Sequence, residues 1–235
     1  MENMDSRPNA LPRAFRTSVP VLLGYVTIGF GFGLLAVNSG YPAWFALAMS
    51  IFVYAGAAQY IGIGLFAAGA SISEIALVTL IVNLRHAAYG LSLIKTFGKF
   101  PRLRPYLVFA LTDETYALLS SQDEAARQDG HFMLAVSALN QIYWVAGTAL
   151  GALAGSLIPY RIDGLNFALT AMFLVLAVEQ ALKLRKVLPF ILAGTSTIAA
   201  KFLVGDRGTI IAGLCAATLV LALTARKDRE NAEHN

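Results

Sequence analysis

Long apolar blocks separated by short polar segments make up most of the chain. About 20 consecutive apolar residues are enough to cross a bilayer as a helix. Blocks of this kind lie at 18–37, 43–70, 74–94, 106–121, 131–158, 165–182, 187–204 and 209–225. The 43–70 block is too long for one simple span, and the 106–121 block is short and interrupted by the letters TDET. The pattern predicts an all-α, polytopic, multi-pass membrane protein with seven or eight membrane segments.

Composition agrees with this pattern and sets the expected limits of the membrane domain. Hydrophobic residues make up 57% of the 235 residues and charged residues 14%, whereas roughly a quarter of a soluble domain is charged. We therefore divide the chain into a cytoplasmic N-terminal segment (1–17), an integral membrane domain (18–225) and a polar C-terminal tail (226–235). The N-terminal segment is expected to lead into an uncleaved first span.

Basic residues beside the apolar blocks predict the orientation of the spans. The net charge is +4, but lysines and arginines that flank membrane blocks orient them, so no nucleic-acid partner is expected. The N-terminus and residues 95–104, 183–186 and 226–229 all read as cytoplasmic. Simple alternation through eight spans cannot place all four on one side. All four segments can be cytoplasmic if blocks 43–70 and 106–121 each enter and leave the membrane on the same side, as broken helices that line a cavity.

Two segments of the chain resemble each other, as expected for duplicated halves. YVTIGFGFGLLA (25–36) aligns with YWVAGTALGALA (143–154), and residues 52–59 align more weakly with 173–180. Duplicated halves with a site at their interface are a common plan for transporters. Chance similarity between apolar segments is the alternative.

Glycines at every fourth position form small-residue faces on two of the expected helices. One face holds Gly29 and Gly33, and the other holds Gly147, Gly151 and Gly155. Glycine at this spacing lets helix backbones approach closely in lipid. We favour packing within the monomer over an oligomer interface.

Polar side chains inside the 74–94 block are the first candidates for a functional site. A charged side chain at the middle of a bilayer costs roughly 2.5–3.5 kcal/mol on insertion scales, yet the block contains Asn83, Arg85 and His86. Asn83 and His86 are three residues apart and share a helical face. A role facing a ligand or gate is one interpretation, and a structural ion pair made by Arg85 between helices is the other.

Three further polar residues join the candidate list. Asp113 and Glu114 are suited to an ammonium group or a coupled proton, or Thr112 or Asp113 simply caps a helix. Gln59 lies among small residues, where it contacts a ligand or makes an interhelical hydrogen bond.

No enzyme chemistry is indicated, and neither a metal nor a cofactor is expected. The histidines are scattered and form no zinc motif, and there is no phosphate-binding loop. No nucleophile elbow is present. The single cysteine, Cys215, lies in an apolar run and is interpreted as a small buried residue.

Four ordered motifs resemble the AzlC-type branched-chain amino acid permease family. They are GYVTIGFGFGLLA (24–36), MSIFVYAGAAQY (49–60), NLRHAAYGLSL (83–93) and LTDETYALL (111–119). The resemblance implies a bacterial inner (plasma) membrane exporter of leucine, isoleucine and valine. It also implies a small AzlD-like membrane protein as a separate partner and export driven by the proton motive force.

The residues and the resemblance together give a hypothesis for the site. A branched-chain amino acid is a zwitterion with an apolar tail, and its carboxylate prefers a cation. We expect Arg85 to serve that carboxylate, and Asp113 or Glu114 to serve the ammonium group or the proton. Gln59, Asn83 and His86 would line the same cavity. A non-transporting membrane subunit and a channel are the alternative functions.

Overall fold

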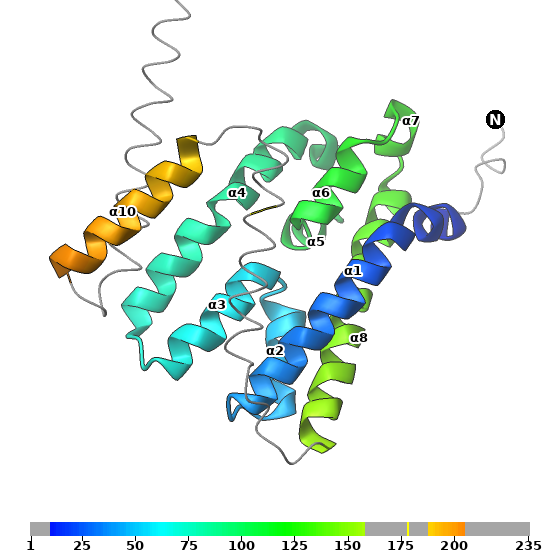
Figure 1. Ribbon diagram of the computed structural model, residues 1–235. Helices are drawn as coiled ribbons and strands as arrows, with labels where there is room; N and C mark the ends of the chain where they lie inside the picture. Colours follow the sequence, from blue (N-terminus) through cyan, green and yellow to red (C-terminus); the bar gives the residue numbers. More distant parts are fainter. Residues whose placement is uncertain (1–9, 158–177, 179–187, 205–235) are drawn as a thin grey trace, which may run out of the picture. The chain divides into compact units, whose positions relative to one another are not determined.

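The computed structural model describes residues 10–157, 178 and 188–204, and within these residues every regular element is a helix (Figure 1). The helices are α1 (Ala10–Asn38), α2 (Ala43–Phe52), α3 (Gly56–Ala67), α4 (Ile72–Gly98), α5 (Arg104–Phe109), α6 (Asp113–Ser120), α7 (Glu124–Arg127), α8 (Gly130–Leu157) and α10 (Leu188–Val204). The expected span at 209–225, most of that at 165–182, Cys215 and the aligned segment 173–180 apart from Val178 lie outside the described residues.

The chain divides into two compact units, which are considered separately. The first is Met1–Ala70 with Val82–Asp163, and the second is Ser71–Ile81 with Gly164–Asn235. Helix α10 belongs to the second unit, and α4 begins there and continues into the first. All candidate site residues belong to the first unit.

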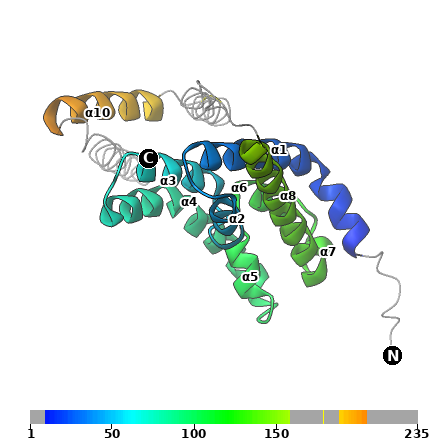
Figure 2. The same ribbon diagram turned by 90° about the horizontal axis from the view of Figure 1, so that it is seen from below.

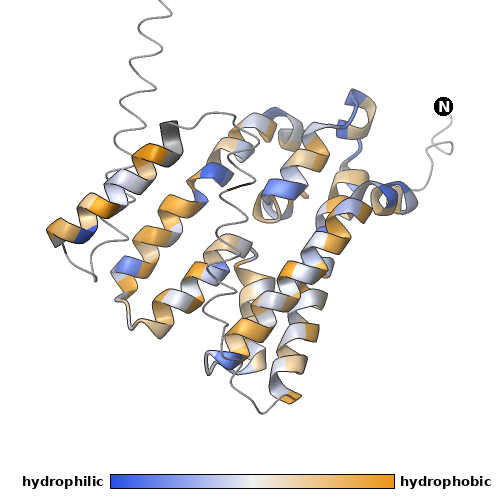
Figure 3. Ribbon diagram, viewed as in Figure 1, coloured by the Kyte–Doolittle hydropathy of each residue, from blue (hydrophilic) through white to orange (hydrophobic). Residues whose placement is uncertain are grey.

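Three of the described helices, α1, α4 and α8, are long and apolar enough to cross a membrane. They contain 29, 27 and 28 residues, which at about 1.5 Å per residue is roughly 40 Å and exceeds a 30 Å hydrocarbon core. Helix α7 and the start of α1 are hydrophilic, and α4 and α6 each carry a hydrophilic segment, while apolar colour predominates on the longer helices (Figure 3). The described part of the chain is therefore all-α, as expected for a membrane protein, and the total of seven or eight segments remains a prediction.

Helix α1 begins eight residues before the expected span, at Ala10 rather than at residue 18. The early prolines do not prevent this start. Pro12 lies in the first turn, where the backbone N–H groups have no intrahelical partner.

The two unusual blocks of the sequence are both broken helices. Block 43–70 forms α2 and α3 with a break at residues 53–55, and block 106–121 forms α5 and α6 with a break at 110–112. Helices α2 and α3 have 10 and 12 residues, so each rises roughly 15–18 Å, about half a bilayer core. Entry and exit on the same side remains a prediction.

The two breaks lie beside each other in the first unit. Tyr54 in the first break has φ +44°, a left-handed conformation that few residues other than glycine adopt. Its ring lies 6.3 Å from that of Phe109, at the end of α5. Gln141 of α8 connects the same two helix ends. Its Nε2 donates to the Ile51 carbonyl at 3.0 Å, and its Oε1 accepts from the Tyr106 hydroxyl at 2.7 Å.

Helices α1 and α8 run side by side in the same direction, with their glycine faces in contact (Figures 1 and 2). A Cβ atom added to Gly29 would lie 2.7 Å from the Trp144 carbonyl oxygen, and one added to Gly147 would lie 2.5 Å from the Val26 carbonyl oxygen. At Gly33 and Gly151 the added atom would collide with the carbonyl oxygens of Thr148 and Phe30. Only glycine permits this backbone contact.

The contacts of the glycine faces are reciprocal. The backbone neighbours of Gly29 include Trp144 and Thr148, and those of Gly147 include Val26 and Phe30. These are the positions that the alignment of 25–36 with 143–154 makes equivalent. A local two-fold relation between the two segments would produce this arrangement, although duplication of whole halves remains a prediction.

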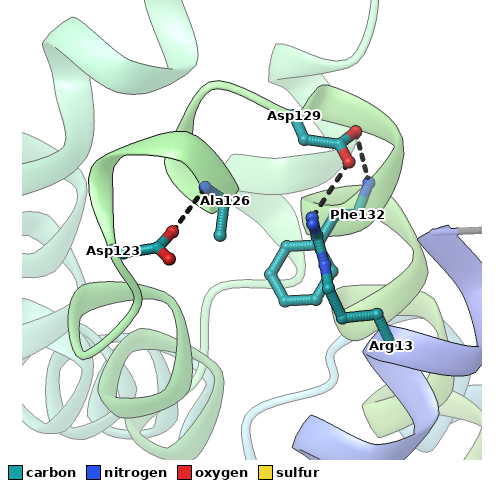
Figure 4. A network of polar contacts seen from close by, with 5 residues as sticks. All are labelled: Arg13, Asp123, Ala126, Asp129 and Phe132. Carbon is teal, nitrogen blue, oxygen red and sulfur yellow. Dashed lines mark hydrogen bonds and ion pairs between the residues drawn. The ribbon is translucent and has the colours of Figure 1, made fainter. Parts of the chain in front are cut away.

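One end of the α1–α8 pair is held by an ion pair and an apolar cluster. Arg13 Nη2 donates to Asp129 Oδ2 at 2.9 Å, and the guanidinium lies 4.1 Å from the centre of the Phe132 ring (Figure 4). Asp129 also caps α8, since its Oδ1 accepts from the Phe132 N–H at 3.0 Å. The buried side chains beneath come from helices α1 and α4 to α8 and include Phe97, Leu107, Leu119 and Met133.

Candidate functional site

Arg85 and Asp113 form an ion pair between α4 and the first turn of α6. Arg85 Nη1 lies 2.8 Å from Asp113 Oδ2, and about a third of each side chain is exposed. The break at 110–112 makes this contact possible, because it starts a new helix with Asp113 as its first residue. The interhelical ion pair considered from the sequence is therefore present.

The ion pair leaves several buried polar atoms without a hydrogen-bond partner. Arg85 Nε, Asp113 Oδ1 and Asn83 Oδ1 are buried and make no hydrogen bond. Most buried polar atoms in folded proteins have a partner, so each exception needs an explanation. Arg85 thus contributes a donor at this position, and Asp113 and Asn83 contribute acceptors.

Aromatic side chains surround this pair. His86 contacts Tyr89 edge to face, with ring centres 5.9 Å apart. Tyr89 stacks on Tyr116 of α6, with ring centres 4.4 Å apart and an interplanar angle of 11°. The Tyr116 hydroxyl donates to Ser92 Oγ at 3.2 Å. These contacts join α4 to α6 and place aromatic faces near the charged pair.

Glu114, the neighbour of Asp113, is bonded to a different helix. Its Oε2 accepts from the Tyr25 hydroxyl of α1 at 2.7 Å. The same hydroxyl lies 2.6 Å from Thr112 Oγ1. Thr112 is the N-cap of α6, since its Oγ1 accepts from the Thr115 N–H at 3.2 Å. The capping interpretation is therefore right for Thr112. The two carboxylates that follow it, Asp113 and Glu114, contact different helices.

A buried polar cluster continues from Thr112 toward α8. Thr112 Oγ1 lies 3.0 Å from Thr115 Oγ1, which accepts from Asn140 Nδ2 at 3.0 Å. Thr115 and Asn140 are fully buried. Asn140 Oδ1 has no hydrogen-bond partner, and neither does the buried hydroxyl of Tyr54, which lies near Tyr25 and Thr115.

Gln59 makes its side-chain contacts elsewhere, in a network between α2, α3 and α8. Its Oε1 accepts from Trp144 Nε1 and its Nε2 donates to Ser50 Oγ, both at 3.1 Å. Ser50 Oγ in turn lies 2.8 Å from Thr148 Oγ1. From the sequence we expected Gln59 to line the same cavity as Arg85, with an interhelical hydrogen bond as the alternative. In the structure Gln59 makes interhelical hydrogen bonds.

Sequence reasoning did not place four residues that lie around Thr112 and Glu114. Tyr25 and Tyr54 look like ordinary aromatic residues of apolar blocks, and Thr115 looks like part of a capping motif. Asn140 is the only one of these four with a signal in the sequence, a carboxamide inside an apolar block. Within residues 10–157, 178 and 188–204, no group of three or more metal-binding side chains is found.

Comparison with known proteins identifies the class. A family model described as AzlC protein matches residues 20–158, more than half of the chain. The chain belongs to the AzlC family. The matched region of this AzlC-family protein contains both helix breaks, the Arg85–Asp113 pair and Glu114.

Relatives of the protein are membrane proteins, and one is a transport protein by name. The chain is 30% identical to the branched-chain amino acid transport protein AzlC of Bacillus subtilis over 225 residues, which cover 95% of this chain and 88% of that protein. It is 41% identical over 174 residues to an uncharacterized membrane protein of Helicobacter pylori, covering 73% and 75% of the two chains. Identity to the inner membrane protein YgaZ of Escherichia coli is 30% over 167 residues, 68% of each chain. No solved structure matches. The AzlC-family protein is thus a transport-related membrane protein.

Proposed function

We propose that this protein is a secondary transporter that exports branched-chain or related small apolar amino acids across the bacterial inner membrane. In this proposal the proton motive force drives export, and a small AzlD-like membrane protein acts as a separate partner. Membership of the AzlC family supports the class, and the named Bacillus subtilis relative supports the substrate class. The observation that carries the proposal is the Arg85–Asp113 pair with its unused buried atoms.

A zwitterion is the ligand that fits a separable ion pair. Arg85 and Asp113 neutralise each other in the structure. A neutral ligand that separated them would leave two partly buried charges unpaired, which is strongly unfavourable. An amino acid replaces one ion pair with two, since its carboxylate binds Arg85 and its ammonium group binds Asp113. Neither charge is left without a partner.

The surroundings favour a substrate with an apolar tail. Tyr89 and Tyr116 present stacked ring faces near the pair, and such faces bury apolar groups well. His86 lies on the same side through its edge contact with Tyr89. The nearby helix break lets α6 start within the apolar block, as in transporters whose half-helices meet the substrate.

The test is leucine efflux from preloaded cells that express the chain alone or with its small membrane partner. Arg85→Ala removes the proposed carboxylate-binding group. Arg102→Ala is the matched control, because Arg102 is an exposed arginine in the turn after α4. We expect saturable efflux that needs the partner, disappears in Arg85→Ala and persists in Arg102→Ala.

Other results would overturn the proposal in distinct ways. No efflux of leucine, isoleucine or valine in either format, with the protein present in the membrane, contradicts the substrate class. Flux that does not saturate indicates a channel. A reconstituted chain that moves no substrate, but is needed for another protein's transport, indicates a non-transporting subunit.

A further inference from the structure

The Tyr25 hydroxyl lies between two acceptors and has one hydrogen to give. It is 2.7 Å from Glu114 Oε2 and 2.6 Å from Thr112 Oγ1. A phenolic hydroxyl donates only one hydrogen bond, although it also accepts. The protonation state of Glu114 therefore decides which way the Tyr25 hydrogen points.

This choice extends along a chain of hydroxyls. Thr112 Oγ1 is 3.0 Å from Thr115 Oγ1, and Thr115 Oγ1 already accepts from Asn140 of α8. When Glu114 is ionised, the Tyr25 hydroxyl donates to its carboxylate and no longer to Thr112. When Glu114 is protonated it donates to Tyr25. Tyr25 then donates to Thr112 and Thr112 donates to Thr115, so the hydrogen of Thr115 needs another acceptor.

Tyr54 is placed to be that acceptor. Its hydroxyl is buried and lies close to the hydroxyls of Thr115 and Tyr25. Tyr54 also forms the break between α2 and α3, with its positive φ. A hydrogen bond from Thr115 to Tyr54 would connect the protonation state of Glu114 to the residue at the helix break.

Glu114 has the exposure and the neighbours that such a role requires. It is exposed, while Tyr25, Thr112 and Thr115 are buried. The titratable groups near it are Tyr25 of α1, Tyr54 of the break, Tyr89 of α4 and its own neighbour Asp113, which is bound to Arg85. Among the described residues no basic side chain forms an ion pair with Glu114. A proton can therefore bind or leave without breaking an ion pair.

We propose that Glu114 is the carboxylate that binds the coupled proton, and that Tyr25 transmits its protonation state to the junction of the two helix breaks. The proton adds to the Glu114 carboxylate from one side of the membrane and leaves the same carboxylate to the other. No covalent bond other than this O–H bond forms or breaks. The inference rests on the proposed function, because it assigns the coupling step of that transport.

The experiment separates exchange of substrate from its coupling to protons. The chain and its small membrane partner are reconstituted in vesicles, and labelled leucine is followed in two assays. The first is leucine–leucine exchange at equal pH on both sides. The second is accumulation driven by an acidic vesicle interior, because outward proton flow drives inward leucine movement through an antiporter.

Glu114→Gln is expected to keep exchange and to lose accumulation driven by the pH gradient. Glutamine keeps the size of the side chain and its hydrogen bond to Tyr25 but cannot titrate. Glu124→Gln is the matched control, since Glu124 is an exposed carboxylate at the start of α7. This control should match the unmodified protein in both assays.

Tyr25→Phe tests the transmitting hydroxyl without moving the ring. The Tyr25 ring makes an edge contact with Trp144 at 5.5 Å, which phenylalanine retains. We expect retained exchange and weakened accumulation. Tyr41→Phe is its control, because the Tyr41 ring stacks on Phe45 away from this chain of hydroxyls.

Each contrary result identifies what fails. Absence of leucine exchange by the unmodified protein contradicts the proposed function itself. Exchange that is unaffected by a pH gradient in the unmodified protein leaves that function standing and overturns the coupling role. Full pH-driven accumulation by Glu114→Gln also overturns it. Loss of both exchange and accumulation in correctly inserted Glu114→Gln would make Glu114 part of the substrate site instead.

Discussion

Arg85 Nη1 lies 2.8 Å from Asp113 Oδ2, and this contact ties the middle of α4 to the first residue of α6. Glu114, the next residue, is bonded to Tyr25 of α1 instead. Two adjacent carboxylates thus face two different helices, because successive residues of a helix point about 100° apart. This separation allows one carboxylate to serve the substrate and the other to serve the proton.

Removing both members of the Arg85–Asp113 pair should separate its structural role from its transport role. Arg85→Ala and Asp113→Ala each leave a partly buried charge unpaired, so each should lower stability and abolish leucine efflux. The double variant leaves no unpaired charge and should regain stability. It should not regain efflux, because the groups that bind the substrate are missing. Thermal unfolding in detergent and efflux are measured on the same variants.

The Arg13–Asp129 pair is the matched control for this experiment. It also joins two helices, but it lies among the polar residues at the start of α8 and makes an additional contact with Phe132 (Figure 4). Its double alanine variant should keep efflux in proportion to the amount of folded protein. Recovery of efflux in the Arg85→Ala/Asp113→Ala variant would mean that the pair is only a gate or scaffold.

Asp129 should stabilise the protein mainly as the N-cap of α8. Its Oδ1 accepts from the Phe132 N–H, and Asn is as good an N-cap as Asp, whereas alanine costs about 1 kcal/mol. We therefore expect Asp129→Asn to retain about 1 kcal/mol of unfolding free energy that Asp129→Ala loses. Denaturant titration in detergent measures the difference. Equal loss in both variants would assign the effect to the ion pair.

The glycine contact between α1 and α8 should tolerate no side chain. A Cβ atom at Gly151 would collide with the Phe30 backbone, so Gly151→Ala must separate the helices. Overpacking typically costs about 1–3 kcal/mol, and we expect the upper part of this range or failure to accumulate in the membrane. Gly24→Ala, on α1 with no neighbour within 4 Å, should be neutral or slightly stabilising. Membrane abundance and thermal unfolding compare the two, and equal behaviour would contradict the contact.

Gln59 should contribute to stability and not to substrate affinity. Its hydrogen bond with Trp144 is fully buried, and such a bond contributes about 1 kcal/mol. A double-mutant cycle of Gln59→Leu and Trp144→Phe should show a coupling of about this size. The KM for leucine should not change. A raised KM without loss of stability would place Gln59 in the substrate site after all.

Local pattern was enough to predict the three long described helices and the two breaks, but not to pair the polar residues. The TDET interruption marks the N-terminus of α6, and the length of the 43–70 block signals a break, because both features are local in the sequence. Trp144, one partner of Gln59, lies 85 residues away, and Tyr25, the partner of Glu114, lies 89 residues away. No spacing rule connects such positions. Tyr25 and Tyr54 were missed for the same reason, since a tyrosine in an apolar block carries no local sign of what its hydroxyl meets.

By itself the sequence determined that this protein folds in a lipid bilayer. It also marked the positions at which the apolar blocks are interrupted. Apolar blocks of bilayer length form helices in lipid, and glycines at every fourth position indicate a closely packed neighbouring helix. Only the tertiary structure decided that the glycine faces of α1 and α8 contact each other. It alone also decided that Arg85 pairs with Asp113 and that Glu114 bonds to Tyr25. The hydrophobicity of each segment depends only on that segment's own residues, so it can be read directly from the sequence. Hydrogen bonds and ion pairs depend on a few ångströms of separation between segments, which only folding establishes.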